Sequence, residues 1–193
     1  MDPKNDMIKV IGVVDKSLYT EKLIVKAKVN DKKQVVSDTD QDTLKIVIVN
    51  RYFQTRPAVA FIKGYNMKSG AIAVSVSHDS HNITCVGVSD SDIVRAINLV
   101  ISTQGGASAT ANGKDLLLPL PIAGLMSVLT AKETADRYKE LQDFAKFLGC
   151  KLESPFPTLT FMALTVIPEL KVSDKGLFDV ALRKLVSVYQ GDN

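Results

Sequence analysis

Short apolar runs separated by turn-forming residues constrain the fold of this 193-residue chain more than any other feature. Runs of strand length that are bounded by Gly, Asn and Asp predict β-strands. The run at 44–49 is more continuously apolar and is expected nearer the centre of a sheet. The run at 22–29 partly alternates and is expected to leave one face exposed to solvent. The predicted strands lie at residues 8–14, 22–29, 34–36, 44–49, 59–63, 71–76 and 83–88.

The run that begins at Ala71 has two unlike faces. Its odd-numbered positions from 71 to 77 carry only Ala or Ser, whereas positions 72, 74 and 76 carry Ile or Val. Alternate residues of a strand point to opposite faces, so one face is lined by small side chains. We expect a helix or another sheet to pack closely against that face.

A first helix is predicted from apolar residues at helical spacing between 93 and 101. Asp90 or Ser91 is expected as its N-cap, because a short polar side chain can accept hydrogen bonds from the first free N–H groups. Gly105 and Gly106 are expected to end it, since Gly adopts the left-handed conformation at low cost.

The segments at 107–111 and 114–118 predict a β-hairpin, with Asn112-Gly113 as its turn. After a turn punctuated by Pro155 and Pro157, the apolar stretch at 159–167 is expected to form another strand.

A second helix is predicted to begin after Thr130, because Thr130 and Glu133 have the spacing of a capping box. Its apolar stripe runs from Tyr138 to Leu148, and Gly149 is expected to close it. The fold class that follows is α/β or α+β, with a mixed β-sheet and two or three packed helices. Residues 1–50 are expected to form a β-rich N-terminal portion, and residues 51–193 an α/β domain.

The composition excludes several classes of protein. The net charge is only +3 and Lys and Arg form no dense patch, so we expect no nucleic-acid partner. No apolar stretch reaches the roughly 18 residues of a membrane span, and residues 1–6 carry no apolar targeting core, so no membrane association is expected. Cys85 and Cys150 have no C-x-x-C spacing and are expected to be reduced core thiols of a cytoplasmic protein.

Both histidines of the chain fall within one short polar stretch between two predicted strands. The stretch contains His78, Asp79, Ser80, His81 and Asn82. Imidazole and carboxylate groups can move protons, and all of these side chains can hydrogen-bond a purine base. Two alternatives stay open. In one, these residues have only the structural role of shaping a turn; in the other, the two histidines and the aspartate together hold a metal ion.

The polar stretch also carries a resemblance to a known family, together with two other blocks in the same order. These blocks are residues 76–83, residues 118–127 and residues 155–180, and the segments at 61–65, 68–73 and, more loosely, 8–51 fit as well. Read together, they resemble the C-terminal region of adenine deaminase, a member of the amidohydrolase superfamily. Residues 51–193 are therefore expected to be an α/β domain similar to that region. Phe53 stands where relatives often carry His, and Pro157 and Thr165 also depart from the pattern.

The resemblance implies the conversion of adenine and water to hypoxanthine and ammonia. In the family, a (β/α)8 barrel holds a manganese or iron centre, and the C-terminal region packs beside it. Such a centre needs about four His ligands and this chain has two His in total, so we expect no cofactor in this chain alone. The expected partner is an amidohydrolase barrel domain or chain.

The resemblance assigns catalytic roles to His78, Asp79 and His81, and adenine-binding roles to Ser80 and Asn82. Catalysis is expected only together with the barrel. Two non-enzymatic alternatives remain: a free-standing purine-binding or regulatory module, and an assembly domain whose β-rich part makes homo-oligomer contacts.

Overall fold

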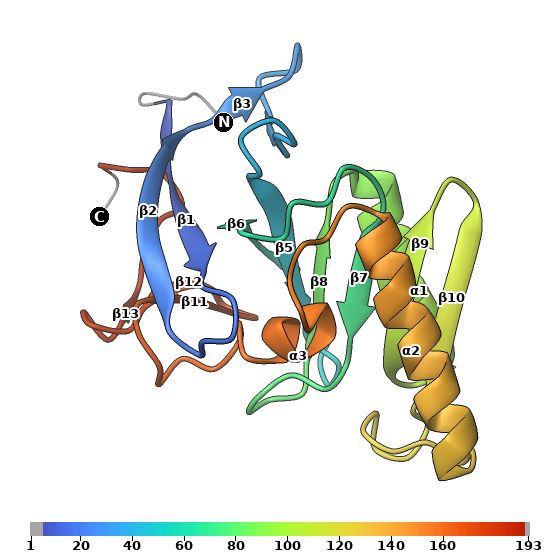
Figure 1. Ribbon diagram of the computed structural model, residues 1–193. Helices are drawn as coiled ribbons and strands as arrows, with labels where there is room; N and C mark the ends of the chain where they lie inside the picture. Colours follow the sequence, from blue (N-terminus) through green and yellow to red (C-terminus); the bar gives the residue numbers. More distant parts are fainter. Residues whose placement is uncertain (1–5, 192–193) are drawn as a thin grey trace.

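The structure, a computed structural model, describes residues 6–191, and its largest element is a mixed β-sheet with helices on both faces (Figure 1). The strands of this sheet are β1 (Met7–Val13), β2 (Thr20–Lys26), β5 (Leu44–Val49), β6 (Ala58–Lys63), β7 (Ala71–Val74), β8 (Ile83–Gly87), β9 (Gly106–Ala111) and β10 (Lys114–Pro119). Their order is β10-β9-β7-β8-β5-β6-β1-β2, and every neighbouring pair is antiparallel except β1 and β6, which are parallel. The predicted mixed sheet is confirmed.

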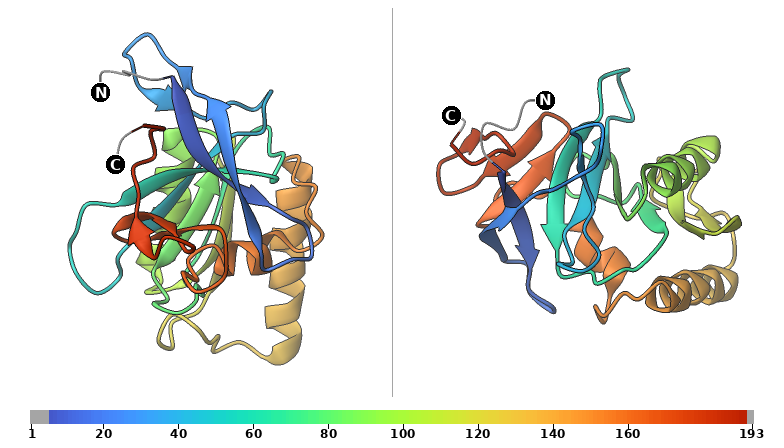
Figure 2. Two further views of the ribbon diagram at one scale, coloured as in Figure 1. Left: turned by 90° about the vertical axis from the view of Figure 1, so that its left-hand side faces the viewer. Right: turned by 90° about the horizontal axis from the view of Figure 1, so that it is seen from above.

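Three helices and two small sheets complete the described fold. The helices are α1 (Asp90–Ser102), α2 (Ala131–Phe147) and α3 (Pro155–Thr160). One small sheet pairs β3 (Lys28–Val29) with β4 (Val35–Val36), and the other contains β11 (Leu170–Ser173), β12 (Gly176–Asp179) and β13 (Lys184–Leu185). Figure 2 shows α1 on one side of the sheet and α2 on the other.

The small-residue face of β7 is where α1 packs, as expected. Ala71 and Ala73 belong to a buried cluster with Ile93, Ala96 and Val100 of α1. The opposite face of the sheet is covered by α2 and α3, whose buried side chains join the largest hydrophobic core. The small side chains therefore decide which face admits α1 closely.

The first fifty residues contribute strands to the same sheet as the rest of the chain. β1 and β2 form one end of it, and β5 lies between β6 and β8, which confirms that the run at 44–49 is central. The division at residue 50 stays a prediction. Residues 1–5, most of the stretch in which no targeting core was expected, lie outside the described residues. Within residues 6–191, no helix is both long and apolar enough to cross a membrane.

The strand predicted at 159–167 is wrong, because the chain forms α3 and then a series of turns there. Pro155 stands in the first turn of α3, where its missing N–H has no helical partner to lose. Phe156 and Leu159 are buried three residues apart, on one face of the helix. A short apolar run looks the same in a buried helix and in a strand, so periodicity alone could not separate them.

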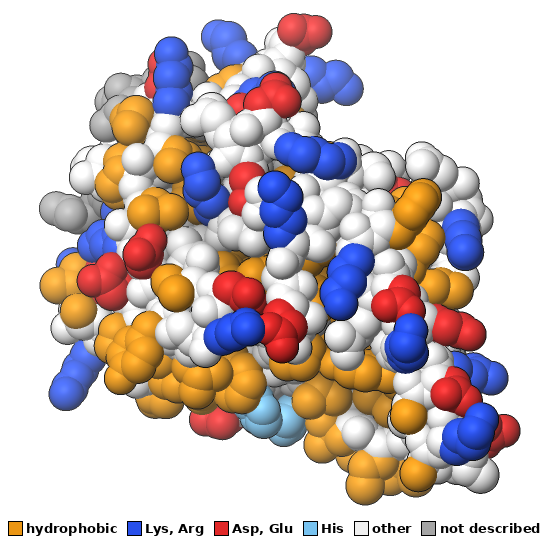
Figure 3. Space-filling model, in the orientation of Figure 1, with side chains coloured by type: hydrophobic (Ala, Val, Ile, Leu, Met, Phe, Trp, Pro, Cys, Tyr) orange, Lys and Arg blue, Asp and Glu red, His pale blue; other side chains and the backbone are white. Residues whose placement is uncertain are grey.

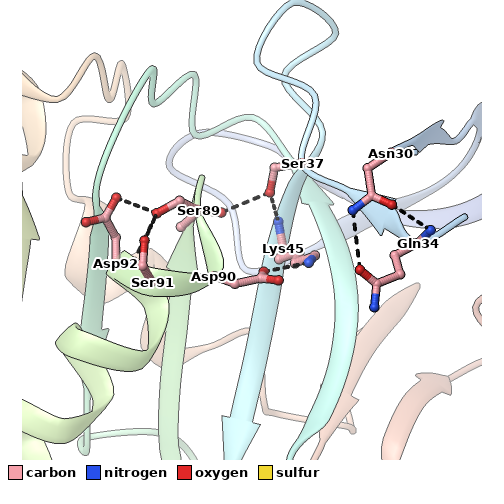
Figure 4. Close-up of polar contacts among 9 residues, drawn as sticks. Asn30, Gln34, Ser37, Lys45, Ser89, Asp90, Ser91 and Asp92 are labelled. Carbon is pink, nitrogen blue, oxygen red and sulfur yellow. Dashed lines mark hydrogen bonds and ion pairs between the residues drawn. The ribbon is translucent and has the colours of Figure 1, made fainter. Parts of the chain in front are cut away.

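The ends of α1 also differ from the prediction. Its N-cap is Ser89, not Asp90 or Ser91, and the Ser89 hydroxyl accepts a hydrogen bond of 3.1 Å from the Asp92 N–H (Figure 4). At the other end, Gln104 (φ 60°) and the predicted Gly105 (φ 139°) both have positive φ, and the Gly105 N–H donates to the Val100 carbonyl at 3.0 Å. Gly106 already belongs to β9.

The ends of α2 match the prediction. Thr130 and Glu133 form the reciprocal capping box, in which each side chain accepts from the other residue's backbone N–H. Gly149 follows the helix with φ +102°, and its N–H donates to the Lys146 carbonyl at 2.9 Å. The described cysteines, Cys85 and Cys150, are buried and free.

Gly70 and Gly113 provide a matched test of how tightly β7 and β9 pack. Both have positive φ, but a Cβ on Gly70 would lie 2.4 Å from the Thr110 carbonyl oxygen, whereas a Cβ on Gly113 would meet nothing within 4 Å. Gly113→Ala should lower the free energy of unfolding by about 1 kcal/mol through backbone strain alone. Gly70→Ala should cost at least about 2 kcal/mol more, because a backbone atom must move. Urea denaturation measures both, and equal costs would contradict the close approach.

Candidate functional site

The two histidines lie in the connection between β7 and β8, and residues 77–82 are called the histidine turn below. The Ser77 carbonyl accepts a 2.6 Å hydrogen bond from the His81 N–H, and His81 Nδ1 accepts from the Ser77 N–H at 3.3 Å. The Ser77 hydroxyl is buried and lies 2.7 Å from the Thr84 hydroxyl at the start of β8. The strands thus close the turn from both sides and leave Nε2 of neutral His81 as the protonated nitrogen.

His78 is positioned by the end of α3. Its N–H donates to the Thr160 carbonyl at 3.0 Å, and its ring lies 5.0 Å from the ring of Phe161. The rings of His78 and His81 are 5.7 Å apart in an edge-to-face arrangement. The segment whose secondary structure was predicted wrongly therefore helps to hold the first histidine.

Arg51 holds the other side of the histidine turn, and the sequence reasoning gave it no role. Its N–H donates to the Asn82 side-chain oxygen at 3.1 Å, and its Nη1 donates to the His81 carbonyl at 3.0 Å. Its Nη2 donates to the carbonyls of Gln104 and Ala123, each at 3.1 Å. One side chain thus ties the turn to the end of α1 and to the loop after β10.

Gly124 explains how the guanidinium fits. A Cβ at this position would lie 2.1 Å from Arg51 Nη2, so only glycine leaves room for the charged group. Arg51 has no motif of its own in the sequence. Gly124 lies within the block at 118–127 that carries the family resemblance. A glycine in that block was the available sign that another group approaches the backbone closely there.

The members of the histidine turn differ in exposure. Asp79 and Ser80 are exposed, His78 and His81 are half-buried, and Asn82 is 2% exposed. The Ser80 carbonyl accepts a hydrogen bond of 2.9 Å from the Tyr52 hydroxyl. The structure therefore brings the two histidines together, while Asn82 supports the backbone of Arg51. The roles predicted for Ser80 and Asn82 in adenine binding stay predictions.

The environment of His81 favours its neutral form. Burial lowers the pKa of His81, the positive charges of His78 and Arg51 act in the same direction, and Asp79 opposes them. Because the folded-state pKa is below the unfolded value of about 6.5, His81 removes stability as the pH falls through that region. Near neutral pH, His81 is therefore a neutral imidazole whose Nε2–H can donate a hydrogen bond, because Nδ1 already accepts one from the Ser77 N–H.

The residues of the site do not fit a metal centre. Among residues 6–191, no three His, Cys, Asp or Glu side chains come together in a way that could hold an ion. The alternative in which His78, Asp79 and His81 together bind a metal is therefore not supported. The imidazole and carboxylate side chains of the histidine turn can exchange protons and form hydrogen bonds.

The histidines lie on the surface of the molecule. Figure 3 shows them at the lower edge of this view, with hydrophobic side chains on both sides. Loops at this end of the sheet thus surround a polar turn with apolar surface. The fold and site together define an α/β domain that presents a pair of imidazoles from one end of its sheet.

Comparison with known proteins gives the family. Residues 17–184 match the family described as "Adenine deaminase C-terminal domain", and the chain belongs to that family. It is 46% identical over 183 residues to the adenine deaminase of Salinibacter ruber, which covers 94% of this chain and 33% of that protein. The adenine deaminase of Methanosarcina barkeri is 44% identical over 185 residues, with 96% and 33% covered. The chain thus spans about a third of the length of the curated relatives it matches.

The lowered pKa of His81 can be measured by NMR titration of the imidazole resonances. His81 should titrate below the ordinary value of about 6.5. His78→Gln should raise the pKa of His81 because it removes a positive neighbour, and Asp79→Asn should lower it further because it removes the opposing charge. Shifts in the reverse directions would show that the two side chains do not face His81 as described.

The role of Arg51 can be measured by stability. Arg51→Lys should lower the free energy of unfolding by about 2 kcal/mol, because an ammonium group cannot reach three carbonyls from one position. Arg56→Lys is the control, since Arg56 is exposed, and it should change stability by less than about 0.5 kcal/mol. Equal effects of the two substitutions in urea denaturation would contradict the claim that the hydrogen bonds of Arg51 to the three carbonyls stabilise the fold.

Proposed function

We propose that this chain acts as the C-terminal part of an adenine deaminase and works with a metal-bearing barrel domain, on the same polypeptide or on a second one. The observation that carries the proposal is the family match over residues 17–184 in a chain that spans only a third of its relatives. The reaction would convert adenine and water to hypoxanthine and ammonia. The barrel would hold manganese or iron, which activates the attacking water when bound.

Within that reaction, the histidine turn would move protons. The amino group of adenine leaves as ammonia and must gain a proton, while the attacking water must lose one. His78 would exchange protons with the reacting groups. Neutral His81, whose Nδ1 accepts from the Ser77 N–H, would present its Nε2–H as a hydrogen-bond donor beside the ring of His78. The charge of Asp79 would favour the protonated form of a neighbouring imidazole, as it does for His81. Ser80 and Asn82 would contact the base.

The setting of the protein is part of the same proposal. Burial raises the pKa of the Cys150 thiol to about 11. Because the thiolate is the form that is oxidised, a thiol that stays protonated near neutral pH resists oxidation. Cys85 is also free and completely buried. Two protected thiols agree with a protein of the cytoplasm, where we place this chain.

A deamination assay tests the proposal with this chain and the part of the Salinibacter ruber enzyme that lies outside the matched third, co-expressed and purified together. The pair should convert adenine to hypoxanthine in the presence of manganese, and the chain alone should not. His78→Ala and His81→Ala should each lower kcat about 100-fold or more while the two parts stay associated. Lys132→Ala, at an exposed position on α2, is the control and should leave kcat unchanged.

Metal-dependent turnover by the chain alone would contradict the division of labour. Calorimetry with adenine and hypoxanthine separates the non-enzymatic alternative. Tight binding of a purine by the isolated chain, with no turnover by the pair, would instead assign the chain to a free-standing purine-binding role.

A further inference from the structure

The loops around the histidine turn expose large hydrophobic side chains to solvent. Six of them belong to three loops that follow β5, β10 and α3, and each is 45–73% exposed: Tyr52, Phe53, Ile122, Met126, Val128 and Val166. The histidine turn and these six residues are called the histidine face. Apolar side chains gathered around a polar centre are typical of a surface that another protein covers.

Hydrogen bonds and a ring contact connect the three loops to the turn. The Tyr52 hydroxyl donates to the Ser80 carbonyl, and Arg51 joins the carbonyls of His81 and Ala123. On the other side, the ring of Phe161 lies against His78. In Figure 3, hydrophobic surface extends to both sides of the histidines. These contacts place residues of all three loops against the histidine turn at the end of the sheet.

A second apolar surface lies beside α1 and is the main competitor. Val47, Val59, Val94, Ile97 and Ile101 line a groove of about 500 Å³ between α1 and the strands β5 and β6. Its charged members include Lys45 and Asp90, which form an ion pair with each other at 2.6 Å. The groove thus offers packing surface but no histidine, whereas the histidine face offers both.

We infer that the histidine face docks on the open end of the metal-bearing barrel domain, over its active site. This inference rests on the proposed function. The relatives carry about two thirds of their length outside the matched part, which is long enough for a further domain that would pack against this one. Barrel enzymes build their active sites from the loops at one end, and only docking through the histidine face brings His78 and His81 to that end. Burial of the apolar side chains would also exclude water from the reacting groups.

Three Val→Asp variants test the inference on equal terms. Val128→Asp and Val166→Asp place a carboxylate on the loops that follow β10 and α3, at positions that are each 71% exposed. Val94→Asp places the same group in the α1 groove, at a position that is 55% exposed. Each variant is co-expressed with the unmatched part of the Salinibacter ruber enzyme, and the dissociation constant is measured after purification. The first two should weaken association at least about tenfold, and Val94→Asp should leave it unchanged.

Hydrogen exchange provides a readout that does not depend on variants. Hydrogen exchange is measured on this chain alone and on a fused protein in which the chain replaces the matched third of the Salinibacter ruber enzyme. Backbone amides of the histidine turn and of residues 50–54 and 120–129 should exchange more slowly in the fused protein. Protection of α1 instead, or a loss of association only in Val94→Asp, would overturn the inference. Failure of the unchanged chain to associate would also overturn it.

Failure of the docking surface and failure of the proposed function give different results. If Val128→Asp and Val166→Asp separate the two parts while His78→Ala keeps full turnover, the surface stands and the catalytic role of the histidine falls. If the histidine variants lose turnover while Val128→Asp and Val166→Asp leave the dissociation constant unchanged, the catalytic role of the histidines stands and the docking surface is wrong. A dimer of the isolated chain that Val128→Asp dissociates would assign the surface to a second copy and overturn the inference.

Discussion

The guanidinium group of Arg51 is the contact on which the functional end of the molecule depends. It donates to carbonyls of three segments that are far apart in the sequence: the histidine turn, the end of α1 and the loop after β10. The absence of a side chain on Gly124 makes the approach possible. Because a charged donor that serves several carbonyls is costly to displace, the turn, the helix end and the loop hold a common arrangement. The histidines are thus presented by a rigid end of the sheet and not by a free loop.

Much of the fold could be predicted from local patterns. The central strand at 44–49, the hairpin around Asn112-Gly113 and the capping box at Thr130 were all found from the sequence and are confirmed. The small-residue face of β7 even predicted that an element would pack there, although not which one. These features are local, because a turn, a cap or an alternation is complete within a few residues.

The errors arose where local sequence does not determine structure. The apolar stretch after Pro157 forms the last turn of α3 and further turns, and apolar residues such as Leu159 and Met162 are buried in it without strand structure. Arg51 was missed because its partners are backbone carbonyls, which any residue can supply. The histidine turn itself was found because the chain has only two histidines. Their neighbours in space, Phe161 and Arg51, are contacts of the tertiary fold and carry no signal in the sequence.

The described residues include no group of three His, Cys, Asp or Glu side chains that could hold a metal ion. We propose that the domain contributes proton-transfer groups to a site whose metal is held by the barrel. Paramagnetic NMR tests this most directly, with the imidazole resonances of His78 and His81 observed as the chain is assembled with a barrel part loaded with manganese. The account predicts that both resonances broaden strongly on assembly and sharpen when the manganese is replaced by a diamagnetic ion. Resonances that stay sharp in a fully assembled, active complex would show that the histidines lie far from the metal, and would contradict the account.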